Sequence, residues 1–246
     1  GEDPQIELGL DDVALLTYTS GTTGSPKGAM NTHKNIAFNA EVYRRWMYLA
    51  ESDVILGIAP LFHITGLVAH IAVAGLVAIP LILSYRFDAG EMLRLTQRWR
   101  GTFTIAAITA FTALMNHPDI EKFDLSTLHK LYSGGAPIAM TTIEKFQRIT
   151  GHYINNIYGM TETTSPTHAV PLGEKAPIDE ERGTLAVGIP IPNTLARVVD
   201  VISGVDIPVG DLGEIIVKGP SVVPGYCQKP QETANAIREG WMFTGD

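Results

Sequence analysis

Short apolar runs rich in β-branched residues alternate along most of this chain with longer stretches whose apolar residues recur at helical spacing. Residues 13–17, 54–58 and 102–106 form runs of the first kind and predict strands. The helical spacing predicts helices over 32–49, 89–98, 110–116 and 140–150. Because strands and helices alternate, we expect an α/β fold with a largely parallel sheet flanked by helices on both faces.

The pattern changes after about residue 171. Residues 183–225 contain short strand-like runs, at 196–201 and 214–217, separated by turns rich in Gly, Pro and Asp. This composition favours a smaller, mainly β subdomain. We therefore predict an α/β subdomain over residues 1–172, followed by a mainly β subdomain over 173–246.

The stretch from 64 to 83 is apolar enough to resemble a membrane span, but glycine, histidine and proline interrupt it. A buried helix over 63–77 followed by a buried strand over 78–84 explains the pattern better, since an element covered on both sides is apolar all round. We therefore expect no transmembrane segment.

Charge and cysteine content exclude several classes of protein. The 18 basic and 26 acidic side chains give a net charge of −8, and the basic residues are scattered, so nucleic acid is not an expected partner. Cys227 is the only cysteine, which excludes an internal disulfide framework. The acidic start of the sequence has no secretion signal, so we expect a cytoplasmic protein.

The loop after the first predicted strand, residues 19–28, is dense in glycines and hydroxyl side chains and contains Lys27. Such a loop suits phosphate groups, because glycines let backbone N–H groups approach an anion and a lysine adds positive charge. A P-loop phosphotransferase is one alternative, but the spacing does not fit it. Counted from Gly21, Pro26 replaces the second glycine of that motif, and Gly28 stands where its magnesium-binding hydroxyl belongs.

Across all ten residues, this loop resembles the signature loop of the adenylate-forming superfamily, which includes acyl-CoA synthetases, luciferases and peptide-synthetase adenylation domains. The resemblance implies that the loop holds the phosphates of ATP. The residues that would do so are Thr19, Ser20, Gly21, Thr22, Thr23, Gly24 and Lys27.

Further segments resemble this superfamily in the expected order. Residues 59–63 are similar to the segment beside the carboxylate pocket, where His63 would lie near the acyl group. The turn after the predicted strand near 130 is similar to the adenine-binding turn, and small residues there would let the backbone approach a flat ring. That turn consists of Gly134, Gly135, Ala136 and Pro137.

A second signature-like segment covers residues 158–163. The resemblance implies that Tyr158 stacks on adenine, with Gly159 and Met160 beside it, that Thr161 hydrogen-bonds a phosphate, and that Glu162 holds Mg²⁺. Lys27, Thr161 and Glu162 would then be the catalytic residues. Segments 188–190, 213–215, 225–226 and 240–246 follow in family order, and Asp246 would bind the ribose hydroxyls.

The resemblance implies an AMP-forming acid–thiol ligase that joins a carboxylic acid to coenzyme A, with ATP as co-substrate, AMP as a product and Mg²⁺ as cofactor. The apolar stretch 64–79 favours a fatty or aromatic acid over an amino acid, with medium- or long-chain acids first. We expect a fragment of the family's large N-terminal domain, truncated before the hinge and the small C-terminal domain, with weak nucleotide binding and negligible turnover. The alternatives are a nucleotide-binding module without catalysis and another adenylate-forming enzyme; the oligomeric state stays open.

Overall fold

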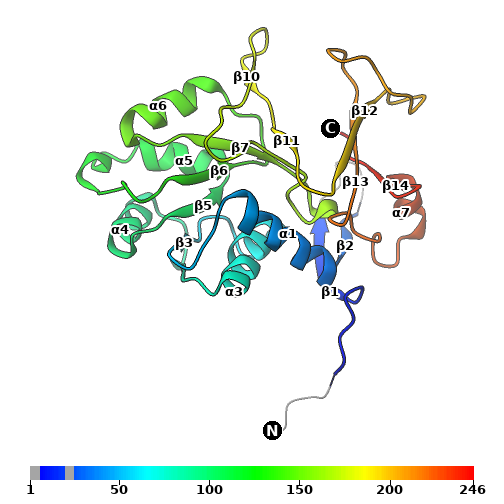
Figure 1. Ribbon diagram of the computed structural model, residues 1–246, viewed down its shortest axis with the longest axis horizontal. Helices are drawn as coiled ribbons and strands as arrows, with labels where there is room; N and C mark the ends of the chain where they lie inside the picture. Colours follow the sequence, from blue (N-terminus) through cyan, green and yellow to red (C-terminus); the bar gives the residue numbers. More distant parts are fainter. Residues whose placement is uncertain (1–5, 20–24) are drawn as a thin grey trace. The chain divides into compact units, whose positions relative to one another are not determined.

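A computed structural model describes residues 6–19 and 25–246 of the protein (Figure 1). They form two compact units, each built from segments that are not contiguous in the sequence. We call the first the hairpin unit; it lies within residues 1–38, 161–164 and 193–246. We call the second the sheet unit; it comprises residues 39–160 and 165–192. The sequence-based division at residue 172 stays a prediction.

The sheet unit is built on a seven-stranded sheet with the spatial order β11-β8-β7-β6-β5-β3-β4. Five neighbouring strands are parallel, and β8 and β11 extend one edge in the antiparallel sense. This confirms the expected α/β class with a largely parallel sheet. The strands are β3 (Ile55–Leu56), β4 (Leu81–Ile82), β5 (Phe103–Ala106), β6 (Lys130–Ser133), β7 (Ile154–Tyr158), β8 (His168–Ala169) and β11 (Ile189–Pro190), with β9 (Ile178–Asp179) and β10 (Thr184–Leu185) forming a separate small hairpin.

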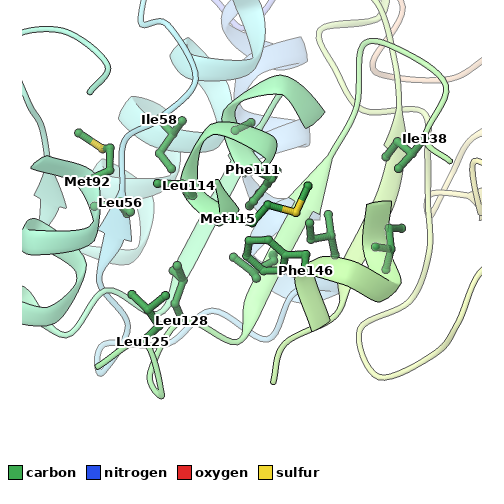
Figure 2. Close-up of a cluster of buried hydrophobic side chains, with 14 of the residues drawn as sticks. Leu56, Ile58, Met92, Phe111, Leu114, Met115, Leu125, Leu128, Ile138 and Phe146 are labelled. Carbon is green, nitrogen blue, oxygen red and sulfur yellow. The ribbon is translucent and has the colours of Figure 1, made fainter. Parts of the chain in front are cut away.

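Three helices cover one face of this sheet, namely α4 (Ala89–Trp99), α5 (Ile108–Met115) and α6 (Met140–Thr150), and a short 3₁₀ turn, η2 (Ile120–Lys122), follows α5. Their apolar sides form the main core with the strands, as Figure 2 shows. Phe111 and Phe146 meet edge to face, with ring centroids 5.5 Å apart, and so join α5 to α6. The predicted helices over 89–98, 110–116 and 140–150 are therefore confirmed, with small shifts at their ends.

Helix α1 (His33–Trp46) supplies side chains to the opposite face. Tyr43 is fully buried and its ring lies 6.5 Å from that of Phe103 on β5. The indole N–H of Trp46 donates to the carbonyl oxygen of Val170. The helix ends earlier than the predicted residue 49, because Tyr48 has a left-handed backbone conformation with φ of 49°.

The predicted helix over 63–77 is present, and its helical segments follow one another without a break from residue 64 to residue 77. They are α2 (Ile64–Gly66), a π-helical segment η1 (Leu67–Ala72) and α3 (Val73–Val77), and the π-helical middle was not predicted. The chain leaves α3 at Ala78 with φ of 57°, and only Leu81 and Ile82 of the predicted strand 78–84 pair as β4. Over the two described ranges, no helix has the length and apolarity that crossing a bilayer requires.

The hairpin unit contains two antiparallel sheets. Strand β1 (Val13–Thr19) pairs with β2 (Lys27–Thr32), and the second sheet has the order β12-β13-β15-β14. The run 13–17 was therefore predicted correctly as a strand but wrongly as part of the parallel sheet. Strand β2 was not predicted, because its sequence is polar and contains glycine. The remaining elements are β12 (Leu195–Val199), β13 (Glu214–Lys218), β14 (Ile237–Arg238), β15 (Trp241–Phe243), α7 (Pro230–Ala236) and the 3₁₀ turn η3 (Thr161–Thr163).

Candidate functional site

The centre of the hairpin unit is a junction of β2 with η3. Asn31 on β2 is fully buried, and its Nδ2 donates to the carbonyl oxygen of Thr161 at 3.1 Å and to Oγ1 of Thr164 at 3.0 Å. Its Oδ1 accepts from the hydroxyl of Thr17 on β1. Since a buried amide without partners is costly, these bonds fix η3 against the hairpin. Thr161 and Glu162, 130 residues from β2 in sequence, are thereby held beside it.

A third segment, residues 223–227, is bonded to both of these elements. The N–H of Met30 donates to the carbonyl oxygen of Gly225 at 3.0 Å, and the N–H of Cys227 donates to that of Gly28 at 2.8 Å. The N–H of Val223 donates to the carbonyl oxygen of Glu162 at 2.9 Å. Backbone hydrogen bonds therefore set the position of the side chain at residue 226 relative to β2 and η3.

The side chain of Tyr226 contacts both Lys27 and Glu162, two of the predicted site residues. The Tyr226 hydroxyl donates to Oε1 of Glu162 at 2.7 Å, and Nζ of Lys27 lies 4.6 Å from the centroid of the same ring. Glu162 and Tyr226 are only 6% and 5% exposed, so neither is a solvated surface group. Burial, together with the adjacent carboxylate, raises the pKa of Tyr226 above its usual value, which keeps the phenol protonated and able to donate.

The predicted phosphate loop begins and ends inside this unit. Thr19 and Lys27 are paired residues of the β1–β2 ladder and so mark the two ends of the loop. The Oγ1 atom of Thr19 is buried and has no hydrogen-bond partner among residues 6–19 and 25–246. The intervening candidates lie outside the described residues, and they are Ser20, Gly21, Thr22, Thr23 and Gly24.

In the sheet unit, two other predicted segments meet at the carboxyl ends of β6 and β7, which are parallel neighbours. The turn Gly134, Gly135, Ala136 and Pro137 follows β6, and Tyr158, Gly159 and Met160 end or follow β7. A Cβ at Gly134 would lie 2.4 Å from the carbonyl oxygen of Ile157, so only glycine allows the turn to pass this close to β7. Ligands of open α/β sheets commonly bind at such carboxyl ends.

An apolar pocket of about 360 Å³ lies at the carboxyl ends of β3 and β5 in the same unit. It is lined by Ile58, Ala59, Pro60, Phe87, Ala106, Ala107, Thr109 and Ala110. Two of these belong to the predicted segment 59–63. His63 is not a lining residue; it caps α2, where its Nδ1 accepts from the N–H of Thr65 at 3.2 Å.

Asp246 follows β15 in the hairpin unit, and its side chain is exposed. Its main-chain oxygen accepts from the N–H of Ile215 on β13 at 3.0 Å, which fixes the backbone that carries the Asp246 side chain. The predicted residues thus form two groups: Thr19, Lys27, Thr161, Glu162 and Asp246 in the hairpin unit, and His63, the 134–137 turn and residues 158–160 in the sheet unit.

Within the described part of the chain, no three His, Cys, Asp or Glu side chains gather as a metal-binding group.

Sequence reasoning missed Asn31, which no motif marked. It also gave no role to Tyr226, although the segment 225–226 was noted.

Comparisons with known proteins show what the chain is similar to. A family model described as AMP-binding enzyme matches residues 2–227. The chain is 38% identical over 237 residues to a long-chain-fatty-acid–CoA ligase of Bacillus subtilis (strain 168), covering 96% of this chain and 41% of the relative. It is 36% identical to a feruloyl-CoA synthase of an Amycolatopsis species, covering 100% of this chain and 48% of the relative.

Solved structures show the same similarity. ATP-bound MatB from Rhodopseudomonas palustris superimposes with a TM-score of 0.87 at 34% identity, over 98% of this chain and 46% of that one. The chain therefore spans less than half the length of each of these three relatives.

Proposed function

The chain belongs to the AMP-binding enzyme family, and from that premise we propose that the protein activates a carboxylic acid with ATP and transfers it to coenzyme A. The observation that carries the proposal is the cluster of Lys27, Tyr226 and Glu162. Lys27 in this cluster marks one end of a loop rich in glycine and hydroxyl residues. A lysine, a buried carboxylate and a loop of this kind suit a metal-bound triphosphate. The ATP bound to the related MatB protein supports the same ligand.

The reaction has two displacement steps. The substrate carboxylate attacks the α-phosphorus of ATP, pyrophosphate leaves, and an acyl-adenylate remains. The thiol of coenzyme A then attacks the acyl carbon, AMP leaves, and the thiol proton is released. Neither step needs a nucleophile from the protein, so this chain's residues act by positioning the reactants and by neutralising charge.

Each predicted residue has a part in these steps. Lys27 neutralises charge on the departing pyrophosphate, and Thr161 hydrogen-bonds a phosphate oxygen. Tyr158 stacks on adenine at the carboxyl end of β7, beside the turn that follows β6, and Asp246 accepts hydrogen bonds from the ribose hydroxyls. His63 lies near the acyl group. These roles are proposals for this chain, supported by the placement of the residues on the elements described above.

Magnesium fits the donor set at Glu162. A hard cation takes carboxylate and phosphate oxygens, and a single buried carboxylate matches a site that a nucleotide completes. Mg²⁺ would supply charge neutralisation for the phosphate oxygens of ATP. The task of this chain is then to hold the Glu162 carboxylate in place.

A fatty acid is the first substrate class we propose, and an aromatic acid is the second. The apolar pocket of about 360 Å³ beside residues 59 and 60 favours an apolar acyl group. The similarity to a long-chain-fatty-acid–CoA ligase supports the fatty acid, and the similarity to a feruloyl-CoA synthase supports the aromatic acid. The cytoplasmic location stays a prediction.

The test combines nucleotide binding with substrate-dependent exchange of pyrophosphate into ATP. Lys27→Ala and Glu162→Gln are expected to weaken Mg·ATP binding and to lower any exchange rate about 10²- to 10³-fold, the usual cost of losing a charge-stabilising group. Lys34→Ala is the matched control, since Lys34 is an exposed lysine of the same unit. Unchanged binding in both site variants would refute the proposal. A panel of fatty and aromatic acids in the exchange assay distinguishes the two substrate classes.

A further inference from the structure

Tyr226 stands between two groups of opposite charge. Its hydroxyl holds the Glu162 carboxylate at 2.7 Å, while the Lys27 ammonium lies 4.6 Å from the centre of its ring. We propose that Tyr226 is a positioning residue that orients Glu162 for Mg²⁺–nucleotide and keeps Lys27 from pairing with that carboxylate. The proposal rests on the proposed function and assigns a role to a residue that the reaction itself does not use.

The backbone around Tyr226 is fixed on both sides. The N–H of Tyr226 donates to Oγ1 of Thr233 at 2.9 Å, and its carbonyl oxygen accepts from the N–H of Lys229 at 3.2 Å. Residue 226 also forms an antiparallel bridge with Ala29 on β2. Gly225 has φ of 152°, and a Cβ there would lie 2.5 Å from the Thr233 side chain. The phenol is therefore delivered to Glu162 by a rigid segment.

Lys27 and Glu162 carry opposite charges, and the position of Tyr226 affects how they interact. A lysine on a flexible stem near a buried carboxylate would form a direct ion pair with it, and each charge would then be partly cancelled before the nucleotide arrived. Among the described residues no ion pair joins Lys27 to Glu162. The ring face attracts the ammonium and the hydroxyl attracts the carboxylate, so Tyr226 holds both charges without bringing them together.

The decisive measurement is the equilibrium affinity for ATP, determined with and without Mg²⁺. Tyr226→Phe keeps the ring and removes the hydroxyl. We expect it to reduce the gain in ATP affinity that Mg²⁺ provides about tenfold, and to change the Mg²⁺-free affinity less than threefold, because a hydrogen bond to a charged group is lost while Lys27 keeps its ring contact. Tyr226→Leu removes both contacts and is expected to weaken binding under both conditions.

The chain contains a closely matched control. The Tyr153 hydroxyl accepts from the N–H of Ala176 at 3.3 Å, and Nζ of Lys175 lies 5.9 Å from its ring centroid. This tyrosine belongs to the sheet unit and lies just before the amino end of β7. Tyr153→Phe should leave the effect of Mg²⁺ on ATP affinity unchanged.

A second variant covers the case in which Tyr226→Phe does not fold. Glu162→Asp withdraws the carboxylate by one methylene from the fixed hydroxyl and should reproduce the loss of the Mg²⁺ effect. Combining Tyr226→Phe with Glu162→Gln should add nothing to Glu162→Gln alone, since both act through one carboxylate. A wild-type protein that does not bind ATP would overturn the proposed function and this role together. A wild-type protein that binds ATP, with Tyr226→Phe or Glu162→Asp showing the normal Mg²⁺ effect, would overturn the positioning role alone.

Discussion

Replacement of Asn31 by alanine tests whether the junction of β2 with η3 holds the predicted catalytic segment in place. Asn31 has no solvent exposure, and its amide makes three hydrogen bonds, with Thr17, the carbonyl of Thr161 and the hydroxyl of Thr164. Asn31→Ala removes all three and leaves their partners in a buried environment. The Thr164 hydroxyl still donates to the carbonyl oxygen of Ser221 at 3.0 Å, so one partner keeps part of its bonding.

The expected cost follows from these bonds. An intramolecular hydrogen bond contributes about 0.5–1.5 kcal/mol net, so the loss of three predicts a decrease of about 2–4 kcal/mol in the free energy of unfolding. Because Thr161 would lose the amide that fixes its carbonyl, affinity for Mg·ATP should fall in the same variant. Asn235→Ala is the control, since Asn235 is exposed and accepts one bond from Gln231; its effect should stay within about 0.5 kcal/mol.

Urea denaturation, followed by circular dichroism, measures both variants, and calorimetry under native conditions measures ATP binding. The midpoint should shift at constant m-value if only stability has changed. A loss below about 1 kcal/mol in Asn31→Ala would refute the reasoning, because it would mean that η3 keeps its place without this amide. Normal ATP affinity in a folded but destabilised variant would refute the link to the site.

Three further predictions concern the sheet unit. Asp53→Asn should cost about 3–5 kcal/mol, because it leaves buried Lys130 without its charge partner at 2.8 Å. Burial raises the pKa of Asp53, but hydrogen bonds from Lys130, Thr102 and a backbone amide lower it, and the net shift is downward. The free energy of unfolding of the wild-type protein should therefore decrease as the pH falls through about 4, and this decrease should be smaller in Asp53→Asn. Gly134→Ala should lower the free energy of unfolding by about 1–3 kcal/mol, since its Cβ would lie 2.4 Å from a backbone oxygen of β7. Gly75→Ala on α3, where a Cβ meets open space, should raise it by up to about 1 kcal/mol, and thermal unfolding compares the two variants. Burial lowers the pKa of His70 to about 4, so stability should decline as pH falls from about 6.5 towards 4, and His70→Gln should flatten that decline in denaturation curves taken across this range.

Local periodicity was sufficient to predict the central part of the sheet unit, but not its strands β8, β9, β10 and β11. Strand β5 and helices α4, α5 and α6 lie close to their predicted positions, because each buries a continuous apolar side against the same core. Periodicity predicted the helix around His70 but not that its middle, η1, is π-helical. His70 is fully buried and its Nε2 accepts from the N–H of Ala59, a contact that leaves no mark on the spacing of apolar residues.

The hairpin unit was harder to predict because polar residues form its centre. Asn31 and Glu162 are buried through hydrogen bonds to partners 130 and 64 positions away in the sequence, and hydrophobic patterning treats both as surface residues. The motifs around Lys27 and Glu162 nevertheless carry the resemblance to the family, which is confirmed, while the roles of the two residues stay predictions. The sequence therefore indicated the family, whereas the structure shows what holds Glu162.

A neutral side chain of similar size at position 162 would stabilise the fold at least as well as the buried Glu162 carboxylate does. Among the described residues, the neutral phenol of Tyr226 donates a hydrogen bond to this carboxylate and no cation pairs with it, although a buried carboxylate is expensive to desolvate. The Lys27 ammonium lies instead over the ring of Tyr226, 4.6 Å from its centroid. An arrangement that keeps opposite charges apart in a buried site is unfavourable for folding alone but suits a ligand that carries both a metal cation and phosphate anions. The proposed Mg²⁺–nucleotide would supply the opposite charges that Glu162 and Lys27 lack among the described residues.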